Sequence, residues 1–306
     1  MTTITPAEDK DKLSKRAKKN VWLSRSLILP ALIFGIVLTQ IPFLVTIYFS
    51  LLRWNLLMPG QIGFAWFKNY EMVFTSGDLV PSILATVGIT SAAVILSLIV
   101  GLIFALLLDR KFRGQALART LVITPFLIMP AAASLIWKYS MFDTSIGVIN
   151  WVVTSVGLQP IAWSTDFPMA TVIIVLTWQF TPFMMLILLA GLQSQSREVL
   201  EAASVDGAGA LRTFQWMTLP HLRQYIEIAV LLGSIMLLQV FDPVAIMTKG
   251  TGGTKTLAYL LYERAFIGLD VGQAAAYGVV TVVLTLIVAT IALKTLFKVF
   301  MAGGNR

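Results

Sequence analysis

The stretch Arg197–Pro220, REVLEAASVDGAGALRTFQWMTLP, decides the fold because it is a polar segment between two long apolar ones. Its pattern predicts a helix over Arg197–Val205, a break at the Gly-Ala-Gly sequence 207–209 and a second short helix from Ala210 to Met217, before a Leu-Pro stop. We expect a segment of this kind to project from a membrane and to be bound there by another protein.

Composition places the rest of the chain in a bilayer. Of 306 residues, 57% are hydrophobic and 12% are charged, about half the charged fraction of a soluble domain. The chain has no cysteine and only one histidine, His221, so a thiolate or histidine metal site and Ser-His-Asp hydrolysis are not indicated. The net charge of +8 collects beside apolar segments, so it indicates membrane topology rather than a nucleic-acid partner.

Apolar runs of roughly 20 residues, the length that spans a bilayer, predict six transmembrane helices and an all-α integral membrane protein. A basic segment, 1–26, precedes a six-helix domain, 27–300, and a tail, 301–306, follows it. The first run is too long for a signal peptide and is expected to be retained. The predicted spans are 27–52, 81–108, 118–139, 168–192, 225–247 and 277–300.

The distribution of Lys and Arg predicts the topology. Seventeen of the 23 basic residues fall in the N-terminus, the C-terminus and the loops 109–119 and 193–224. The positive-inside rule therefore places these segments and both termini in the cytoplasm. The opposite side carries tryptophans typical of a membrane interface, and Ile146–Val156, too short to span, predicts an interfacial helix there.

A spaced motif lies within the opening stretch. Glu201-Ala202-Ala203 is followed after three residues by Gly207 and after nine more by Met217-Thr218-Leu219-Pro220. This resembles the EAA motif of ABC importer permeases, EAA, three residues, G, nine residues, I-x-L-P, with Met217 in place of the usual Ile. Asp206-Gly207-Ala208 and Thr218-Leu219-Pro220 resemble the carbohydrate-uptake class in particular.

Further positions are similar to the maltose-type permease subunit, and the resemblance covers most of residues 27 to 300. They are Leu29-Pro30, Pro42, Ser50-Leu51-Leu52-Arg53-Trp54, Phe67-Lys68-Asn69-Tyr70, Trp178 and Pro182. The resemblance implies a type I ABC importer permease fold in a bacterial cytoplasmic (inner) membrane. It also implies a second permease subunit, expected to be a different chain, together with two ATPase subunits and an extracytoplasmic binding protein.

The residues of the motif suit close docking of a helix. Small side chains let a helix seat closely in a groove, and glycines permit the turn between two short helices. Glu201 and Asp206 offer charges for a basic partner or for Arg197 and Arg212 nearby, and the resemblance implies that Glu201 forms a salt bridge at the ATPase cleft. The predicted ATPase-coupling residues are Glu201, Ala202, Ala203, Asp206, Gly207, Leu219 and Pro220. An amphipathic interfacial helix without a partner is the alternative.

Polar and helix-breaking residues within spans predict the substrate path, since such residues are costly in a bilayer. Aromatic and amide side chains also suit sugars and polyols. The predicted residues are Trp178, Gln179, Phe180 and Phe183 in the fourth span and Gly233, Gln239 and Asp242 in the fifth, and the resemblance to the maltose-type permease subunit adds Met236. Pro243 is expected to break the fifth span. The alternatives are helix-packing roles for Gln179 and Gln239, and an ion pair of Asp242 with Lys249 or Arg264.

The resemblance implies that the external loop 248–276 reaches the binding protein and the mouth of the cavity. No Walker sequence is present, so ATP and Mg are expected on the partner ATPase, with no cofactor, metal or catalytic residue in this chain. The predicted function is import of a sugar or sugar alcohol, and the chain is not expected to be an enzyme. An ion-coupled secondary transporter that uses Asp242 or Glu227 is the alternative.

Overall fold

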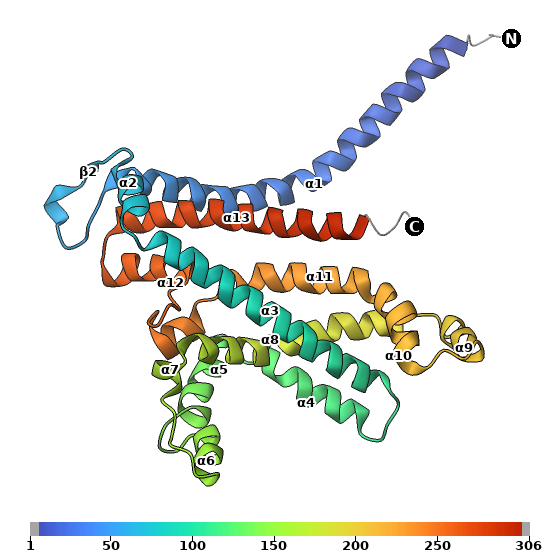
Figure 1. Ribbon diagram of the computed structural model, residues 1–306. Helices are drawn as coiled ribbons and strands as arrows, with labels where there is room; N and C mark the ends of the chain where they lie inside the picture. The colour runs from blue at the N-terminus through green and yellow to red at the C-terminus, as the bar shows by residue number, and fades with distance from the viewer. Residues whose placement is uncertain (1–5, 302–306) are drawn as a thin grey trace.

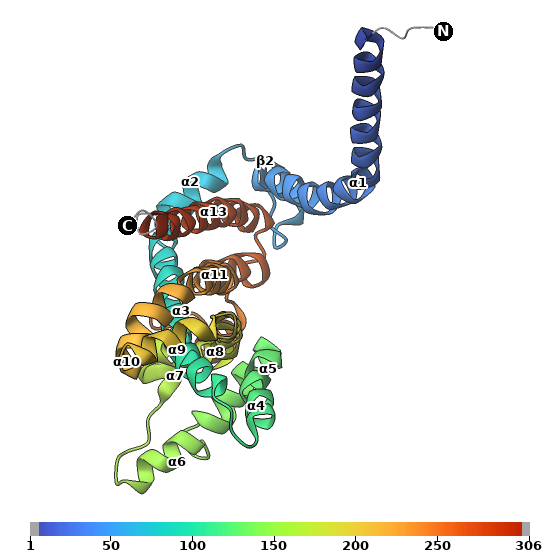
Figure 2. The same ribbon diagram turned by 90° about the vertical axis from the view of Figure 1, so that its right-hand side faces the viewer.

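A computed structural model describes the backbone of residues 6–301 and the side-chain surroundings of residues 28–290. Five long helices dominate the structure (Figure 1): α1 (Pro6–Ser50), α3 (Leu79–Asp109), α8 (Pro168–Gln193), α11 (Leu219–Leu237) and α13 (Val271–Met301). The described part of α1, from Ile28, runs beside α13 (Figures 1 and 2). Most of the predicted tail, 301–306, lies outside the described residues.

Shorter elements connect the long helices, and η marks single 3-10 or π-helical turns. They are β1 (Leu52–Arg53), η1 (Pro59–Gln61), β2 (Gly63–Phe64), α2 (Lys68–Thr75), α4 (Gln115–Leu127), α5 (Pro130–Ile136), η2 (Trp137–Met141), α6 (Val148–Ser155), α7 (Trp163–Asp166), α9 (Arg197–Val205), α10 (Ala210–Thr213), η3 (Phe214–Thr218), η4 (Val244–Thr248), α12 (Leu257–Tyr262) and η5 (Glu263–Ile267). The two strands pair antiparallel, with Leu52 opposite Phe64. Apart from this short ladder, the prediction of an all-α protein is confirmed.

Each of the six predicted spans contains helix. By length and composition alone, four helices among the described residues are long and apolar enough to cross a membrane. These are Ile28–Ser50, Leu79–Asp109, Pro168–Gln193 and Val271–Thr290. The helices Gln115–Leu127 and Pro130–Met141 make a fifth if they are taken together. The remaining long helix, α11, is not among them, since polar residues including Arg223 and Glu227 occupy its first half.

The third predicted span, 118–139, is not one straight helix. The chain direction bends by 101° between its two halves. Ile128 and Met129 are extended, with ψ of 133° at both residues. The physical reason is Pro130, because a proline disfavours the helical conformation in the residue before it. The carbonyl group of Ile128, freed by this break, accepts a hydrogen bond of 3.0 Å from Nε2 of Gln179.

The break predicted at Pro243 in the fifth span is present, and it begins earlier. Helix α11 ends at Leu237, and helical backbone resumes at Asp242 and Pro243, directly before η4. Side chains from other elements bind the carbonyl groups that this break releases. The hydroxyl of Thr90 donates to the carbonyl of Leu237 at 3.1 Å, and that of Thr256 donates to the carbonyl of Val240 at 3.2 Å.

The core forms where α3 crosses α8. Ile89, Ala93 and Val94 of α3 are buried with Val172, Leu176 and Met184 of α8 in one apolar cluster. Gly101 lets the two backbones approach closely, since a Cβ atom there would lie 2.9 Å from Cβ of Met184 and from the backbone nitrogen of Met185. Helix α8 is thereby enclosed by its neighbours, and 56% of its most apolar 18 residues are buried.

We expect Gly101→Ala to destabilise the protein. The added methyl group meets backbone as well as side chain, so the helices must move apart, and overpacking of this kind costs about 1–3 kcal/mol. The measurement is the midpoint of thermal unfolding in detergent. Gly88→Ala on the same helix is the matched control, because its Cβ would have no neighbour within 4 Å. Equal midpoints for the two variants would contradict the close α3–α8 contact.

Candidate functional site

The polar stretch 197–220 has the local structure that its sequence predicts. Helix α9 covers Arg197–Val205, and a Schellman motif ends it. In this motif the N–H of Gly207 donates to the carbonyl of Ser204 at 3.1 Å, and that of Ala208 donates to the carbonyl of Ala203 at 2.9 Å. Gly207 has φ of +79°, a conformation in which a side chain is strained. The glycine of the motif is therefore required by the backbone itself.

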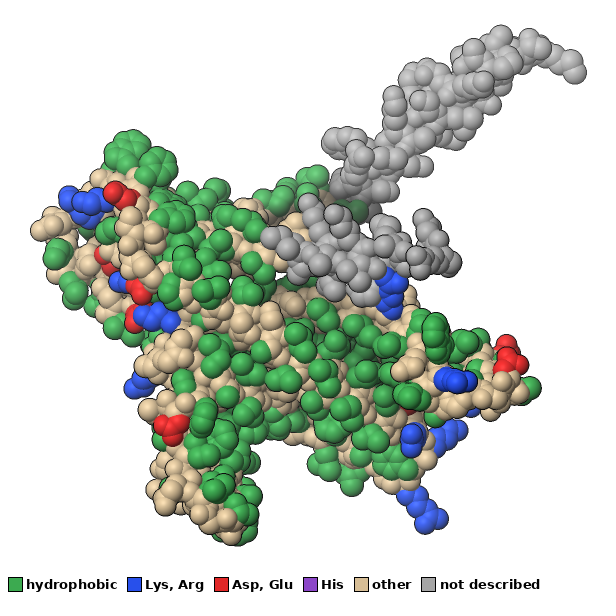
Figure 3. All heavy atoms as spheres, viewed as in Figure 1, with side chains coloured by type: hydrophobic (Ala, Val, Ile, Leu, Met, Phe, Trp, Pro, Cys, Tyr) green, Lys and Arg blue, Asp and Glu red, His purple; other side chains and the backbone are tan. Residues whose placement is uncertain are grey.

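Most of the predicted coupling residues face outward. Glu201, Ala202, Asp206, Gly207, Leu219 and Pro220 are exposed, and only Ala203 is buried. Within the part of the chain that the structure describes, neither acidic side chain forms an ion pair with Arg197 or Arg212. Figure 3 shows charged side chains of both signs at this end of the molecule. Large apolar side chains are exposed beside them, with Val205 at 87% and Trp216 at 74%.

A hydrogen-bonded joint fastens the two ends of this loop to each other. Oγ of Ser194, just after α8, lies 3.0 Å from Nε2 of His221 and 2.8 Å from the hydroxyl of Tyr225, both on α11. His221 also lies 3.0 Å from the carbonyl of Gly191. A Cβ at Gly191 would come within 2.6 Å of the ring of Tyr225. Displacement of the loop is therefore transmitted to α8 and α11 together.

The predicted substrate-path residues of α8 point to different surroundings. Trp178 lines an apolar hollow of about 510 Å³ between α3, α4 and α8, together with Thr177, Thr181 and Pro182. Gln179 is 3% exposed and donates to the carbonyl of Ile128, while its Oε1 has no hydrogen-bond partner. The packing role considered for Gln179 is thus present, as a cap on the broken third span.

Phe180 and Phe183 pack against an aromatic residue that the sequence did not single out. The ring of Phe126, at the end of α4, stacks on Phe183 with centroids 5.4 Å apart and meets the edge of Phe180 at 6.0 Å. This contact comes from the packing of α4 against α8. It joins residues more than 50 positions apart, so no local sequence pattern indicates it.

The four residues predicted from the fifth span are separated by the break after Leu237. Gly233 is buried under Met184, whose Cε would lie 2.2 Å from an added Cβ. Met236 is 43% exposed and Gln239 is exposed. Asp242 is half-buried and forms no ion pair within the described residues, since Lys249 is exposed and Arg264 binds Asp78 instead. Gln179, Gln239 and Asp242 do not line the hollow beside Trp178.

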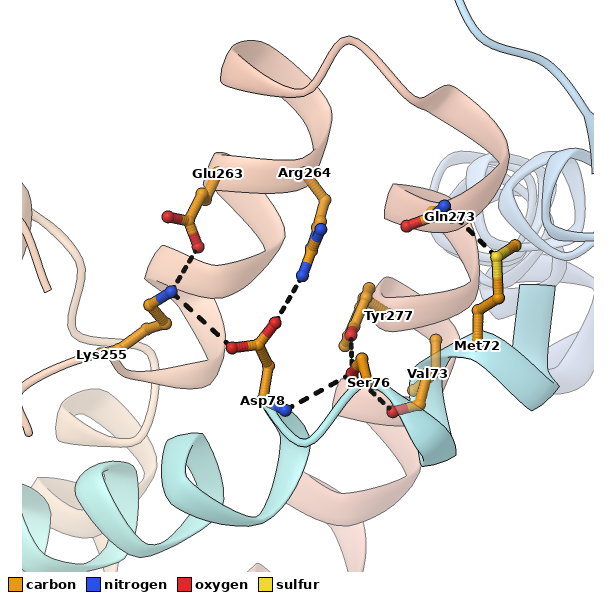
Figure 4. Close-up of polar contacts among 9 residues, drawn as sticks. All are labelled: Met72, Val73, Ser76, Asp78, Lys255, Glu263, Arg264, Gln273 and Tyr277. Atoms are coloured by element: carbon orange, nitrogen blue, oxygen red, sulfur yellow. Dashed lines mark hydrogen bonds and ion pairs between the residues drawn. The ribbon is translucent and has the colours of Figure 1, made fainter.

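At the opposite end from α9, a cluster of four charged residues joins α3 to the external loop (Figure 4). Arg264 donates to Oδ2 of Asp78, the residue before α3. Nζ of Lys255 lies 3.9 Å from Oδ1 of Asp78 and donates to Glu263 at 2.8 Å. The guanidinium of Arg264 also lies 5.7 Å from the ring centre of Tyr277. The sequence analysis missed Asp78 and Lys255, because the pairing depends on residues almost 190 positions apart.

Residues 97–302 of this chain match the family described as "Binding-protein-dependent transport system inner membrane component". The chain belongs to this family. The expectations of a binding-protein-dependent permease in the inner membrane, and of a transport component rather than an enzyme, are therefore confirmed.

Individual relatives cover nearly the whole chain. It is 34% identical to the probable ABC transporter permease protein y4oQ of Sinorhizobium fredii, over 97% of each chain. It is 31% identical to the trehalose/maltose transport system permease protein MalF of Thermococcus litoralis, over 94% of this chain and 97% of the relative. A chain of a bacterial ABC transporter for import of the acidic polysaccharide alginate has the same fold, with a TM-score of 0.75, 19% identity and coverage of 94% and 99%. The predicted importer permease fold is thus confirmed.

The external charge cluster is expected to stabilise this permease modestly. Asp78→Asn removes the shared partner of Lys255 and Arg264, and because each of the four side chains is about a third exposed, we expect a loss of about 1 kcal/mol or less. Thermal unfolding at low and high salt measures it, and the loss should shrink as salt screens the charges. Glu71→Gln is the control, an exposed acid on the same side. A loss that is independent of salt, or equal in both variants, would show that the cluster does not act electrostatically.

Proposed function

We propose that this permease carries a sugar or sugar alcohol across the bacterial cytoplasmic membrane, driven by ATP hydrolysis in partner subunits that bind the stretch 197–220. ATP and Mg are held by those partners, and a second permease subunit, a different chain, completes the transmembrane part. Both termini and the 197–220 stretch face the cytoplasm. The extracytoplasmic binding protein delivers the substrate at the other end of the helices.

The proposed coupling role rests on Glu201 and Asp206, which are exposed and form no ion pair among the described residues. They lie on and directly after α9, a short helix with a rigid base. An exposed carboxylate without an internal partner is available to a basic groove on another subunit. The Schellman motif at Gly207 holds the helix in shape, and the Ser194–His221–Tyr225 joint connects it to α8 and α11. Closure of an ATPase dimer on α9 would therefore move these two helices as a pair and open the path to the outside.

The substrate class is supported by the names of relatives, of which the Thermococcus litoralis protein is described as a trehalose/maltose permease. Within this chain, Met236 just before the break in the fifth span and Gln239 inside it are exposed, and Asp242 is half-buried. A second permease subunit facing them would complete the site. We propose that Gln239 and Asp242 supply hydrogen bonds to hydroxyl groups there, and that Phe180, Phe183 and Trp178 supply the aromatic wall behind them.

The ion-coupled alternative is less well supported. A proton carrier needs an acid that can change its protonation within the span, and Oε1 of Glu227 lies 3.9 Å from Nε of Arg223, one helical turn away. The carboxylate of Glu227 is thus engaged in an ion pair within its own helix. Asp242, which forms no ion pair among the described residues, is the acid that this alternative would have to use. Uptake that is abolished by an uncoupler and does not need the ATPase would favour it.

Glu201→Lys and Gly207→Asp are expected to leave the permease in the membrane at normal levels and to abolish uptake. The first reverses the charge offered to the ATPase, and the second places a side chain at φ of +79°, where it is strained. The measurements are uptake of labelled substrate and co-purification of the ATPase subunit. Ser204→Ala, exposed on the same helix, is the control and should transport normally. Wild-type uptake in either motif variant would refute the coupling role.

The ligand of the cognate binding protein tests the substrate class directly. Calorimetric titration of that protein with mono- and disaccharides, sugar alcohols and, as a negative set, amino acids should yield binding to the first group alone. High-affinity binding of an amino acid or peptide, without any sugar or polyol, would overturn the proposed cargo and leave the coupling role intact.

A further inference from the structure

An arm formed by residues 143–166, between η2 and α8, leaves the bundle at the end opposite α9 (Figure 1). Its tip is helix α6. Figures 1 and 2 agree that the arm extends sideways, across the axes of the long helices, rather than outward beyond their ends. In a membrane crossed by those helices, such an arm follows the plane of the bilayer near its outer surface.

The arm is held in one shape by buried polar contacts. Asn150, 2% exposed, donates from Nδ2 to the carbonyl groups of Phe142, Asp143 and Ile161, and its Oδ1 accepts from the N–H of Ile161 at 2.9 Å. One side chain therefore ties α6 to both legs of the arm. Gly147 is also required, since a Cβ there would lie 2.4 Å from the carbonyl oxygen of Asp143.

A charged turn closes the start of the arm. The carboxylate of Asp143 accepts hydrogen bonds from the N–H groups of Ser145 and Ile146, at 2.8 and 3.1 Å. These two bonds, that of Ser145 first, hold the pKa of Asp143 below its usual value. The base of the arm is aromatic: the ring of buried Phe142 lies 5.2 Å from those of Trp137 and Trp163. The arm, with α7 at its base, is therefore an ordered unit attached to η2.

The ordered arm presents an apolar surface that no other part of the chain covers among the described residues. Trp151 is 70% exposed, Val152 50% and Val156 69%, whereas Asn150 next to them is 2% exposed. Val148, Trp151, Val152 and Ser155 share one face of α6 because they are spaced three and four apart. No charged residue occurs from Thr144 to Thr165. A surface of this kind in water would be an aggregation liability.

The chemistry of this surface fits the lipid headgroup layer better than a protein. Tryptophan and aliphatic side chains on a short helix are typical of the membrane interface. A transient protein partner is steered and oriented by charges, and this arm offers none over 22 consecutive residues. Helices that bind membranes by themselves use Lys and Arg to find the surface, but this one is already attached to membrane helices at both ends.

We propose that the arm lies in the outer headgroup layer of the bilayer, with the Val148–Trp151–Val152 face of α6 inserted among the lipids. It thereby anchors the outer end of α8 at a constant depth while the coupling loop moves the other end, and this anchoring role rests on the proposed function. The position of the arm in the headgroup layer is independent of the cargo and of the ATPase contact.

The absence of cysteine makes the position of the arm measurable. Val152→Cys and Ser155→Cys place a fluorophore on the apolar face, and Thr251→Cys, in the glycine-rich external loop, is the water-exposed control. The assembled transporter, with partner subunits made free of cysteine, is reconstituted in phosphatidylethanolamine and phosphatidylglycerol vesicles. The fluorescence of each label is then measured with two quenchers. One is a phospholipid that carries a nitroxide near its headgroup, and the other is iodide in the aqueous phase.

The labels at 152 and 155 should be quenched several-fold more by the nitroxide lipid than the label at 251, and several-fold less by iodide. Addition of the binding protein should not change this. Equal quenching by iodide at all three positions would place the arm in water and overturn the proposal. Protection from both quenchers would assign the surface to a partner subunit, and iodide quenching removed by the binding protein would assign it to docking. Either outcome would also overturn it.

Discussion

The need to bind every backbone polar group in the absence of water governs how this chain crosses the membrane. Two of its predicted spans are broken, after Leu127 and after Leu237. In each case a side chain from another helix binds a released carbonyl group: Gln179 that of Ile128, and Thr90 that of Leu237. The polar residues of the core therefore act first as supports for irregular backbone. Because these side chains bind the carbonyl groups that the breaks release, the backbone can leave the helical conformation inside the bilayer.

These breaks separate segments that are packed in different ways. The α3–α8 contact around Gly101 is close and apolar, and the outer end of α3 is tied to the external loop by Asp78. The irregular segments 128–129 and 238–241, by contrast, have few helical hydrogen bonds, and side chains of other helices bind their carbonyl groups instead. The core is therefore close-packed where the helices are regular and hydrogen-bonded by side chains where they are not.

Some of this could be predicted from the sequence because the signals are local. The helix–Gly–helix pattern of 197–217 depends on residues within a few turns of each other, and α9, the break at Gly207 and the second helix agree with it. The short helix predicted over Ile146–Val156 is present as α6 for the same reason. The bend at Met129 could not be predicted from hydropathy, since apolar residues continue across it. Only the conformational effect of Pro130 on its neighbour indicates it.

The sequence by itself determined the class of protein, the six helical segments and the local structure of the 197–217 stretch, because hydropathy, charge asymmetry and motif spacing are properties of contiguous residues. Tertiary structure decided which polar residues are free to act. Gln179 is occupied as a cap, Arg264 is committed to Asp78, and Asp242 has no internal partner among the described residues. Those roles depend on distances between segments up to about 190 residues apart in the chain, and such distances are set by the packing of helices against one another.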